Sequence, residues 1–579
     1  MALRIRRSLA VLEQEWKTAK NPSETELGVL IKSFQGIQAL PPDNENSFFT
    51  IGGYHGEPFR GKGTTQDEWW GGYCNHGNVL FPTWHRAYLL RLEDALRSVP
   101  GCGNVTLPFW DECLYITDKP KHLPANDDSG EPTGPLLPEP LKPIDYIPSI
   151  LTMPTLPTGE PNPLYSYALQ KAIDDQIKGA DQRYSKPVGY QTVRYPLSGL
   201  VGNEQDRKET EVHNANYAVA SERTEILNAN VEAWLKGTVK LSGDPKYWPS
   251  DLTSVYGRYL SSLNAPNYTV FSNTRSQTAW NKDPSHPQEQ VMSLESPHNA
   301  IHLAVGGFYQ EGEYNASPII GANGDMGANE MAGFDPIFFL HHCFVDYTFW
   351  QWQKRKGLTT KGSLQIDYDI GAGTTVVPGE AGYPLGDNEA GQKLTMDTPL
   401  YPFKKNPDAI YTSNDVTDIA ELGYDYGLGS LDALRDHKPA WIPLIGEELE
   451  GPINRSIALK KLITGVNRAD YTGSFVIRTF TTHSSGQEIE VGREPILSRW
   501  HVGNCANCRD KLEVESVVAL DRVTLGWLKG DNEDRVLEFR VEIHQFDKSY
   551  KTQYPSRRHL PFAPPGGPPE PIIRDIEVS

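Results

Sequence analysis

The sequence predicts a mainly α-helical domain followed by a β-rich C-terminal domain. In several segments up to residue 356, apolar residues recur at helical spacing, whereas after about residue 470 apolar and polar residues alternate with a period of two. The chain has 579 residues, with 13 Trp and 27 Tyr, which is enough length and aromatic volume for two cores. We therefore expect two folded domains of different class.

Four segments of the first domain are predicted to be helical. Residues 79–98 place leucines three or four positions apart with charges between them, and a Pro-Gly pair follows the segment. The other three are 226–235, a helix that begins near Pro297, and 337–356, which is closed by Gly357. Residues 116–165 are rich in proline and predict a long excursion instead of a core element.

The C-terminal strands are predicted from alternation. Residues 537–544 alternate apolar with charged side chains, which is typical of a half-buried strand, and 474–480 and 514–520 are further candidates. From these changes in pattern we expect a helical domain over 1–430, a linker over 431–465, a β-rich domain over 466–556 and an extended Pro-rich tail over 557–579.

Composition excludes several classes of protein. The net charge is −19, so nucleic acid is not expected as a partner. No run of eighteen apolar residues predicts a membrane span, and the first twenty residues lack the apolar stretch of a secretory signal, which favours an intracellular location. Six cysteines in a chain of this length do not form a disulfide framework.

Seven of the 15 histidines fall into two groups along the chain, and imidazole is the commonest neutral metal ligand. In the second group His298 and His302 are four residues apart, so a helix would place them on one face. The intervening residues lack the glutamate of a zinc protease motif. Two sites of imidazoles alone favour copper. The two groups are His55, His76 and His85, and His298, His302, His341 and His342.

Two long motifs carry a resemblance to a known family. The segment HGNVLFPTWHR, which starts at His76 and leads to Glu93, resembles the first copper signature of the tyrosinases and polyphenol oxidases. The segment DPIFFLHHCFVD, from Asp335 to Asp346, resembles the second. The resemblance covers about residues 40–430 and includes the Tyr-Asp-Tyr motif at 424–426. It implies a four-helix bundle that holds two copper ions and oxidises phenols with dioxygen, in the long form of the fungal pro-tyrosinases.

The resemblance also assigns the ligands. It implies that the first copper is held by His55, His76 and His85, and the second by His298, His302 and His342. His341 then supports a ligand or packs beside it. We expect Asp346 to accept a hydrogen bond from a ligand imidazole and to orient it, with a helix-surface carboxylate as the alternative.

Three residues near the ligands are expected to tune the reaction. In many relatives a cysteine placed like Cys74 is joined to the ligand histidine, here His76, by a thioether bond; a buried thiol is the alternative. Glu295 and Asn299 match the pair that holds a water able to deprotonate a monophenol, although Glu295 could instead cap its helix. Having both residues favours hydroxylation of monophenols as well as oxidation of o-diphenols.

The C-terminal domain is expected to regulate the enzyme. Cys505 and Cys508 form a CxxC pair that relatives are thought to use for copper delivery; a redox pair and half of a zinc site are the alternatives. In such pro-enzymes this domain covers the active site with one bulky side chain, for which Ile496, Leu497 and Trp500 are candidates. We expect an activating protease to cleave the linker, and mild acid or detergent to raise activity.

Other functions are compatible with the same residues. A catechol oxidase or o-aminophenol oxidase would lack monophenol hydroxylation, a haemocyanin-like protein would carry dioxygen without turnover, and a zinc hydrolase is a distant alternative. The expected partners are small phenols, and a homo-oligomer is compatible with the sequence. We expect Cys102, Cys113 and Cys343 to be plain thiols.

Overall fold

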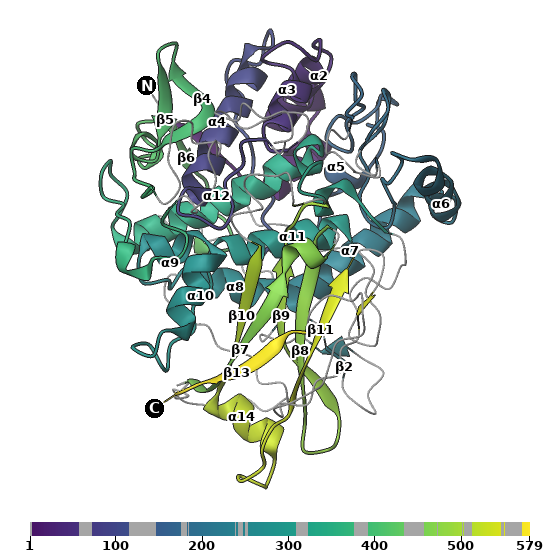
Figure 1. The fold of residues 1–579 in the computed structure, drawn as a ribbon. Helices are drawn as coiled ribbons and strands as arrows, with labels where there is room; N and C mark the ends of the chain where they lie inside the picture. Colours follow the sequence, from purple (N-terminus) through teal and green to yellow (C-terminus); the bar gives the residue numbers. More distant parts are fainter. Residues whose placement is uncertain are drawn as a thin grey trace.

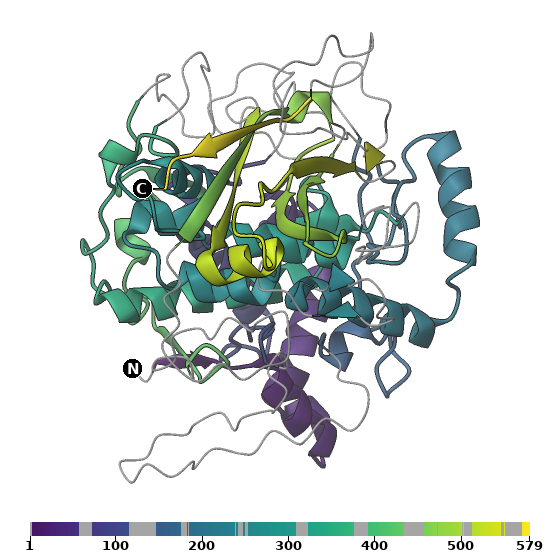
Figure 2. The same ribbon diagram turned by 90° about the horizontal axis from the view of Figure 1, so that it is seen from below.

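The computed structural model confirms a helical domain followed by a β-rich region. Helices occupy the upper part of the molecule in Figure 1, and the C-terminal strands lie below them. Figure 2, seen from below, shows these strands in front of the helices. The structure describes residues 3–56, 72–114, 146–174, 182, 185–237, 239–240, 247–248, 253–307, 322–375, 392–432, 457–471, 473–500, 502, 512–545, 549–550 and 570–578.

The helices include all four predicted segments. None of the described helices is long and apolar enough to cross a membrane. Their bounds are α1 Leu9–Thr18, α2 Glu26–Gln38, α3 Phe48–Gly53, α4 Phe81–Ser98, α5 Ser149–Thr152, α6 Glu204–Ala215, α7 Ala220–Lys236, α8 Val255–Ser262, α9 Tyr268–Ser272, α10 Thr274–Lys282, α11 Glu295–Gly306, α12 Ile337–Lys356 and α14 Arg522–Lys529.

Two helix boundaries show how local signals act. Helix α12 ends at Lys356 because Gly357 adopts φ +69° and donates its N–H to carbonyls of the last turn, as the sequence predicts. Helix α11 begins at Glu295, two residues before the predicted start at Pro297. Proline is tolerated there because N–H groups of the first turn have no partner within the helix.

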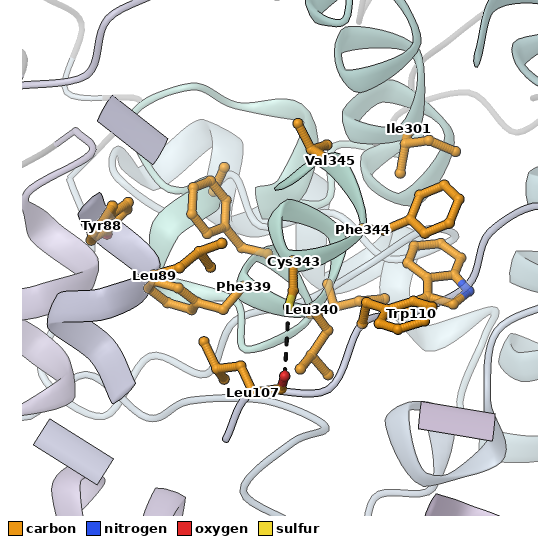
Figure 3. Packing of buried hydrophobic residues seen from close by; sticks show 14 of the residues in the cluster. Tyr88, Leu89, Leu107, Trp110, Ile301, Phe339, Leu340, Cys343, Phe344 and Val345 are labelled. Atoms are coloured by element: carbon orange, nitrogen blue, oxygen red, sulfur yellow. Dashed lines mark hydrogen bonds between the residues drawn. The ribbon is translucent and has the colours of Figure 1, made fainter. Parts of the chain in front are cut away.

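Helix α12 is the centre of the helical core (Figure 3). Its residues Phe339, Cys343 and Phe344 lie among side chains of α4, of α11 and of the segment that follows α4. The Cys343 thiol lies 3.6 Å from the carbonyl oxygen of Leu107, and the backbone N–H of Trp110 donates to the carbonyl of Leu340 at 3.1 Å. Nearly every residue of α12 from Ile337 to Gln353 is buried, so the helix is fixed on all faces.

The Asp346 carboxylate ties the two ends of the helical domain together. Its Oδ1 accepts a hydrogen bond from Arg86 Nε at 2.6 Å, and its Oδ2 accepts from Arg6 at 3.1 Å. The hydroxyls of Tyr424 and Tyr426 also donate to Oδ2, at 2.9 and 2.6 Å. The expectation that Asp346 orients a ligand imidazole is therefore wrong, because guanidinium and phenol groups occupy both oxygens.

Two short strands reinforce this connection between the ends of the helical domain. Strand β1 Arg4–Arg6 pairs in parallel with β6 Tyr424–Tyr426, so the Tyr-Asp-Tyr motif holds the start of the chain. The other short strands are β2 Val239–Lys240, β3 Tyr247–Trp248, β4 Pro399–Asn406 and β5 Ala409–Thr412, which form the hairpins β2–β3 and β4–β5.

The C-terminal region contains two antiparallel sheets. One has the order β10-β7-β13 and the other β12-β11-β8-β9, in agreement with the predicted sandwich-like class. Most of their apolar side chains form a core separate from the helical one. The strands are β7 Ile457–Asn467, β8 Phe475–Thr482, β9 Glu488–Ile496, β10 Glu513–Asp521, β11 Phe539–Gln545, β12 Ser549–Tyr550 and β13 Ile572–Ile576.

Three C-terminal predictions need correction. Strand β7 begins at Ile457, inside the predicted linker, and β13 lies inside the predicted tail and pairs with β7. Strand β11 is not half-buried, because Glu542 and His544 on its polar face are also buried and bond to each other at 2.7 Å. The alternation of apolar and polar residues predicted the strand, but it did not predict that the polar face of the strand is buried as well.

Candidate dinuclear metal centre

Two clusters of histidines meet inside the helical domain. In the first, His55 follows α3, His76 lies in the segment before α4, and His85 lies on α4. In the second, His298 and His302 lie on α11 and His341 and His342 on α12. Within each cluster, one ring nitrogen per residue lies within 4.8 Å of the others. The rings of His85 and His342 stack at 4.5 Å, so the clusters adjoin.

Most of these imidazoles are oriented through Nδ1, which leaves Nε2 directed into the cluster. A metal-binding histidine commonly donates its other ring N–H to a carbonyl or carboxylate, which fixes the ring. Here Nδ1 of each of four residues lies at hydrogen-bond distance from an oxygen: His55 from Asn329 O at 3.2 Å, His85 from Phe81 O at 2.8 Å, His298 from Asn299 Oδ1 at 2.9 Å and His302 from Met326 O at 2.8 Å.

The spacing of the second cluster fits a metal ion. The Nε2 atoms of His298 and His302 lie 3.3 and 3.4 Å from Nε2 of His342. Imidazole nitrogens bind ions such as zinc at about 2.0–2.1 Å, and at that distance this spacing corresponds to an angle of about 110° at the ion. In the first cluster, buried Nε2 of His55 and of His85 have no hydrogen-bond partner among the described residues. Both clusters therefore offer lone pairs to a cation.

The neutral form that binds metals is favoured at six of the seven histidines: His55, His85, His298, His302, His341 and His342. Burial lowers the pKa of His55, His298, His302 and His342 well below the usual value, and the neighbouring imidazoles lower it further. Burial also lowers the pKa of His85 to about 3, although its contact with the Phe81 carbonyl opposes the shift. No proton competes with an ion near neutral pH.

One loop supports a histidine of each cluster. Residues 322–336 contain Met326 and Asn329, whose carbonyls orient His302 and His55. The loop approaches α3 so closely that a Cβ on Gly52 would lie 2.7 Å from the carbonyl oxygen of Gly333. Glycine is required there by the backbone contact, and this contact sets the position of His55.

Glu295 and Asn299 both lie at the centre. Glu295 Oε1 accepts a hydrogen bond from the Gly77 N–H at 2.7 Å, and Oε2 accepts from the N–H and hydroxyl of Thr274 at 2.9 and 3.1 Å. Glu295 is the first residue of α11, and the cap residue Leu294 makes no side-chain cap bond. The carboxylate thus joins the His76 segment to α11 instead of capping the helix, which was the alternative interpretation.

The predictions for the six cysteines differ in what the structure says about them. Cys74 is buried, and its thioether with His76 stays a prediction. Cys505 and Cys508 lie outside the described residues. Cys102, Cys113 and Cys343 are buried and form no disulfide, and burial raises the pKa of Cys343 to about 12. Burial also raises the pKa of Cys113 well above its usual value, so the thiols of Cys113 and Cys343 stay protonated and unreactive at neutral pH.

The three side chains that could plug the active site are buried in two different cores. Leu497 and Trp500 are buried in the core of the helical domain, whereas Ile496 belongs to the core of the β-rich region. The backbone N–H of Trp500 donates to Glu330 Oε1 at 3.0 Å, in the loop that orients His55 and His302. Ile496 therefore supports its own domain.

Two further residues at the centre have no signal in the sequence. Glu112 Oε1 lies 2.6 Å from His341 Nδ1, and Glu112 Oε2 accepts a hydrogen bond from Tyr259 at 2.6 Å. Burial raises the pKa of Glu112 well above its usual value, and only the Tyr259 hydroxyl opposes this. A nearby cation would stabilise the ionised carboxylate. Because these residues come from distant segments, no spacing rule could have found them.

The helical domain thus holds two adjoining clusters of imidazoles, most of them buried and kept neutral, and this donor set has the chemistry of a candidate dinuclear metal centre. Residues 45–355 match the family model described as the common central domain of tyrosinase. The chain is 42% identical to tyrosinase HcTyr2 of Hahella sp., covering 90% of this chain and 89% of the relative. It is 39% identical to a tyrosinase of Aspergillus oryzae, with coverage of 87% and 88%. The chain belongs to the tyrosinase family and is an oxidoreductase of that family.

Solved structures extend the match to the C-terminal region. The tyrosinase from Burkholderia thailandensis at low pH superposes with a TM-score of 0.72 and 42% identity, covering 94% of this chain and 95% of the other. The holo-protyrosinase of Aspergillus oryzae shares the fold, with a TM-score of 0.56, 19% identity and coverage of 94% and 91%. Both protein chains are covered almost completely, so the β-rich region is part of the shared architecture.

Proposed function

We propose that this enzyme uses two copper ions and dioxygen to hydroxylate monophenols at the ortho position and to oxidise o-diphenols to o-quinones. The observation that carries the proposal is the pair of adjoining imidazole clusters. His55, His76 and His85 would hold one ion, and His298, His302 and His342 the other. When bound, the copper pair supplies the electron transfer to dioxygen.

The protein's own contribution includes removal of the phenol proton. The pKa of a phenol in water is about 10, so a base is needed before its oxygen can bind a cation at neutral pH. The Glu295 carboxylate accepts three hydrogen bonds, which leaves one of its roughly four acceptor sites for a water. Asn299 uses Oδ1 on His298, so its amide N–H groups can hold the same water.

The test compares the two activities in the copper-loaded chain. Glu295→Gln should lower monophenol hydroxylation by about 10²–10⁴-fold and diphenol oxidation much less, because a diphenol chelates and is more acidic. Glu289→Gln, an exposed change on the same segment, is the control. Copper content is measured in both. An equal fall of both activities would show that Glu295 acts only as the clamp on Gly77 and Thr274.

We also propose that the C-terminal region covers the site and makes the enzyme latent. Leu497 and Trp500 reach into the helical core, and Ser474 Oγ donates to the Gly327 carbonyl at 2.9 Å. Arg258 of α8 pairs with Glu494 at 3.1 Å and also bonds Ser296 in the first turn of α11. Figure 1 shows β9 ending against α11, which carries two ligands.

Cleavage tests this latency. We place the helical domain before about residue 430 and the cleavage site within 433–456, ahead of strand β7. Limited proteolysis in this segment should raise diphenol oxidation once the C-terminal fragment dissociates. A chain cleaved there and separated from the fragment, yet no more active than the intact chain, would refute the covering role.

Three further proposals have separate tests. Changing Cys505 and Cys508 to Ser should lower copper content at limiting copper if this pair delivers the ion. The Cys74–His76 thioether would make the peptide lighter by two hydrogen atoms in mass spectrometry. A haemocyanin-like carrier would give no coloured quinone from a diphenol, and a catechol oxidase or o-aminophenol oxidase would leave monophenols unchanged.

A further inference from the structure

The second cluster contains one imidazole more than the first. The ring of His341 lies 5.3 Å from that of His298 and 5.1 Å from those of His302 and His342. These separations match those among the other three rings of the cluster, which are 4.5 to 5.5 Å. The rings stacked on the first cluster are those of His298 and His342, on His76 and His85 respectively. His341 thus adjoins the second position.

The two nitrogens of His341 have the arrangement of a metal ligand. Nδ1 lies 2.6 Å from Glu112 Oε1, and Glu112 is held in turn by the Tyr259 hydroxyl. A carboxylate behind an imidazole is the common support of metal-bound histidines. Nε2 is buried and has no hydrogen-bond partner among the described residues. Leaving a buried polar atom unsatisfied is unfavourable, so its place in the cluster calls for an ion as partner.

We propose that His341 is a fourth imidazole ligand of the second metal position, used while the first position is not yet loaded. The inference rests on the proposed function only for the identity of the metal. Four nitrogens form a closed tetrahedral set, which suits copper(I) or zinc. A reactive site needs an open position, so His341 would withdraw when the pair is complete and leave His298, His302 and His342 as ligands. The step exchanges ligands and transfers no electron.

Glu112 fits this role by its charge. When an ion binds Nε2, the ring proton stays on Nδ1 and is donated in a hydrogen bond to Glu112. The positive charge of the ion then balances the negative charge of the buried carboxylate. The same carboxylate returns the ring to one orientation after the ion has moved toward the other three ligands. His341 would therefore hold an incoming ion in place before the first cluster is filled.

The test uses cobalt(II) as the probe on the full, metal-free chain. His55→Phe provides a background in which the first position is disabled, so that one equivalent reports the second. In this background we expect tight uptake and the intense visible absorption of tetrahedral cobalt. Adding His341→Phe should weaken the affinity, measured by chelator competition, by about 10–100-fold and reduce the absorption. His544→Phe, another buried histidine bonded to a glutamate, is the matched control.

Unchanged affinity and spectrum in the His341→Phe chain would overturn the proposal. If that variant does not fold, as judged by circular dichroism, Glu112→Gln replaces it, since the neutral amide still accepts from Nδ1 but cannot compensate the cation; a loss of cobalt affinity is then expected, and no loss refutes the idea. Phenol oxidation by the wild-type copper-loaded chain is measured separately. Its absence would contradict the proposed function without affecting the cobalt result.

Discussion

Replacing Glu490 should unfold the β-rich region while the helical domain stays intact. The Glu490 carboxylate lies between two guanidinium groups and bonds both with paired contacts. Arg478 donates at 3.0 and 2.7 Å and Arg493 at 2.8 and 2.7 Å. All three side chains are at most 1% exposed. Glu490→Gln would leave two buried cations without a full counter-charge, which costs about 3–5 kcal/mol.

The pH dependence gives an independent value for the free energy that Glu490 contributes to folding. Burial alone would raise the pKa of Glu490, but the charges and hydrogen bonds of Arg478 and Arg493 outweigh it and lower the pKa from 4.5 to about 2. A lowered pKa stabilises the fold above pH 4.5, and this stability is lost as the pH falls toward 2. At about 1.4 kcal/mol per pH unit, the loss is on the order of 3 kcal/mol.

The assay is urea unfolding followed by hydrogen exchange of the β8 and β9 amides, at several pH values. Glu488→Gln is the matched control, because Glu488 lies on the same strand, is 41% exposed and pairs with Arg540. An exposed pair contributes about 0–1 kcal/mol. If Glu490→Gln costs no more than Glu488→Gln, or if the wild-type region keeps its stability between pH 4.5 and 2, the buried clamp does not stabilise the region as argued.

This result also bears on acid activation. Burial raises the pKa of Glu494, with Arg258 opposing the shift, so docking makes Glu494 bind its proton more tightly. By linkage, a falling pH therefore favours the docked state at Glu494, because the docked state binds the proton more tightly than the undocked one. Any activation by mild acid should therefore come from loss of stability at Glu490, and Glu490→Gln should activate diphenol oxidation at neutral pH without protease.

Three other changes have definite expected outcomes. Asp346→Asn should lower the free energy of unfolding by about 3–5 kcal/mol and reduce copper content, because buried Arg86 loses its paired carboxylate and Arg6 keeps only Glu93; a variant with wild-type melting and copper content would contradict this role of Asp346. Gly52→Ala should force α3 from Gly333 and reduce metal uptake at the first position, whereas Gly103→Ala, where a Cβ meets nothing within 4 Å, should not. Trp500→Ala should raise diphenol oxidation in the uncleaved chain, and unchanged latency would exclude Trp500 as the plug.

Much of the site could be predicted because its signals are local. The end of α12 follows from Gly357, which acts on the last turn of the same helix. The spacing of His298 and His302 follows from the helical period. The order of a helical domain and a β-rich one follows from the period of apolar residues. Each of these depends on residues within a few positions of one another.

Other features were decided by tertiary structure alone. The partners of Asp346 come from both ends of the helical domain, Glu112 reaches His341 from a different segment, and β13 pairs with β7 across more than a hundred residues. Leu497 enters the helical core while its neighbour Ile496 enters the other. The sequence by itself determined the helices that carry His85, His298, His302, His341 and His342, the order of the two domains, and the histidines that form the two clusters. Only packing decided which distant side chains meet, because such contacts depend on how whole segments fit together and have no signature in local spacing.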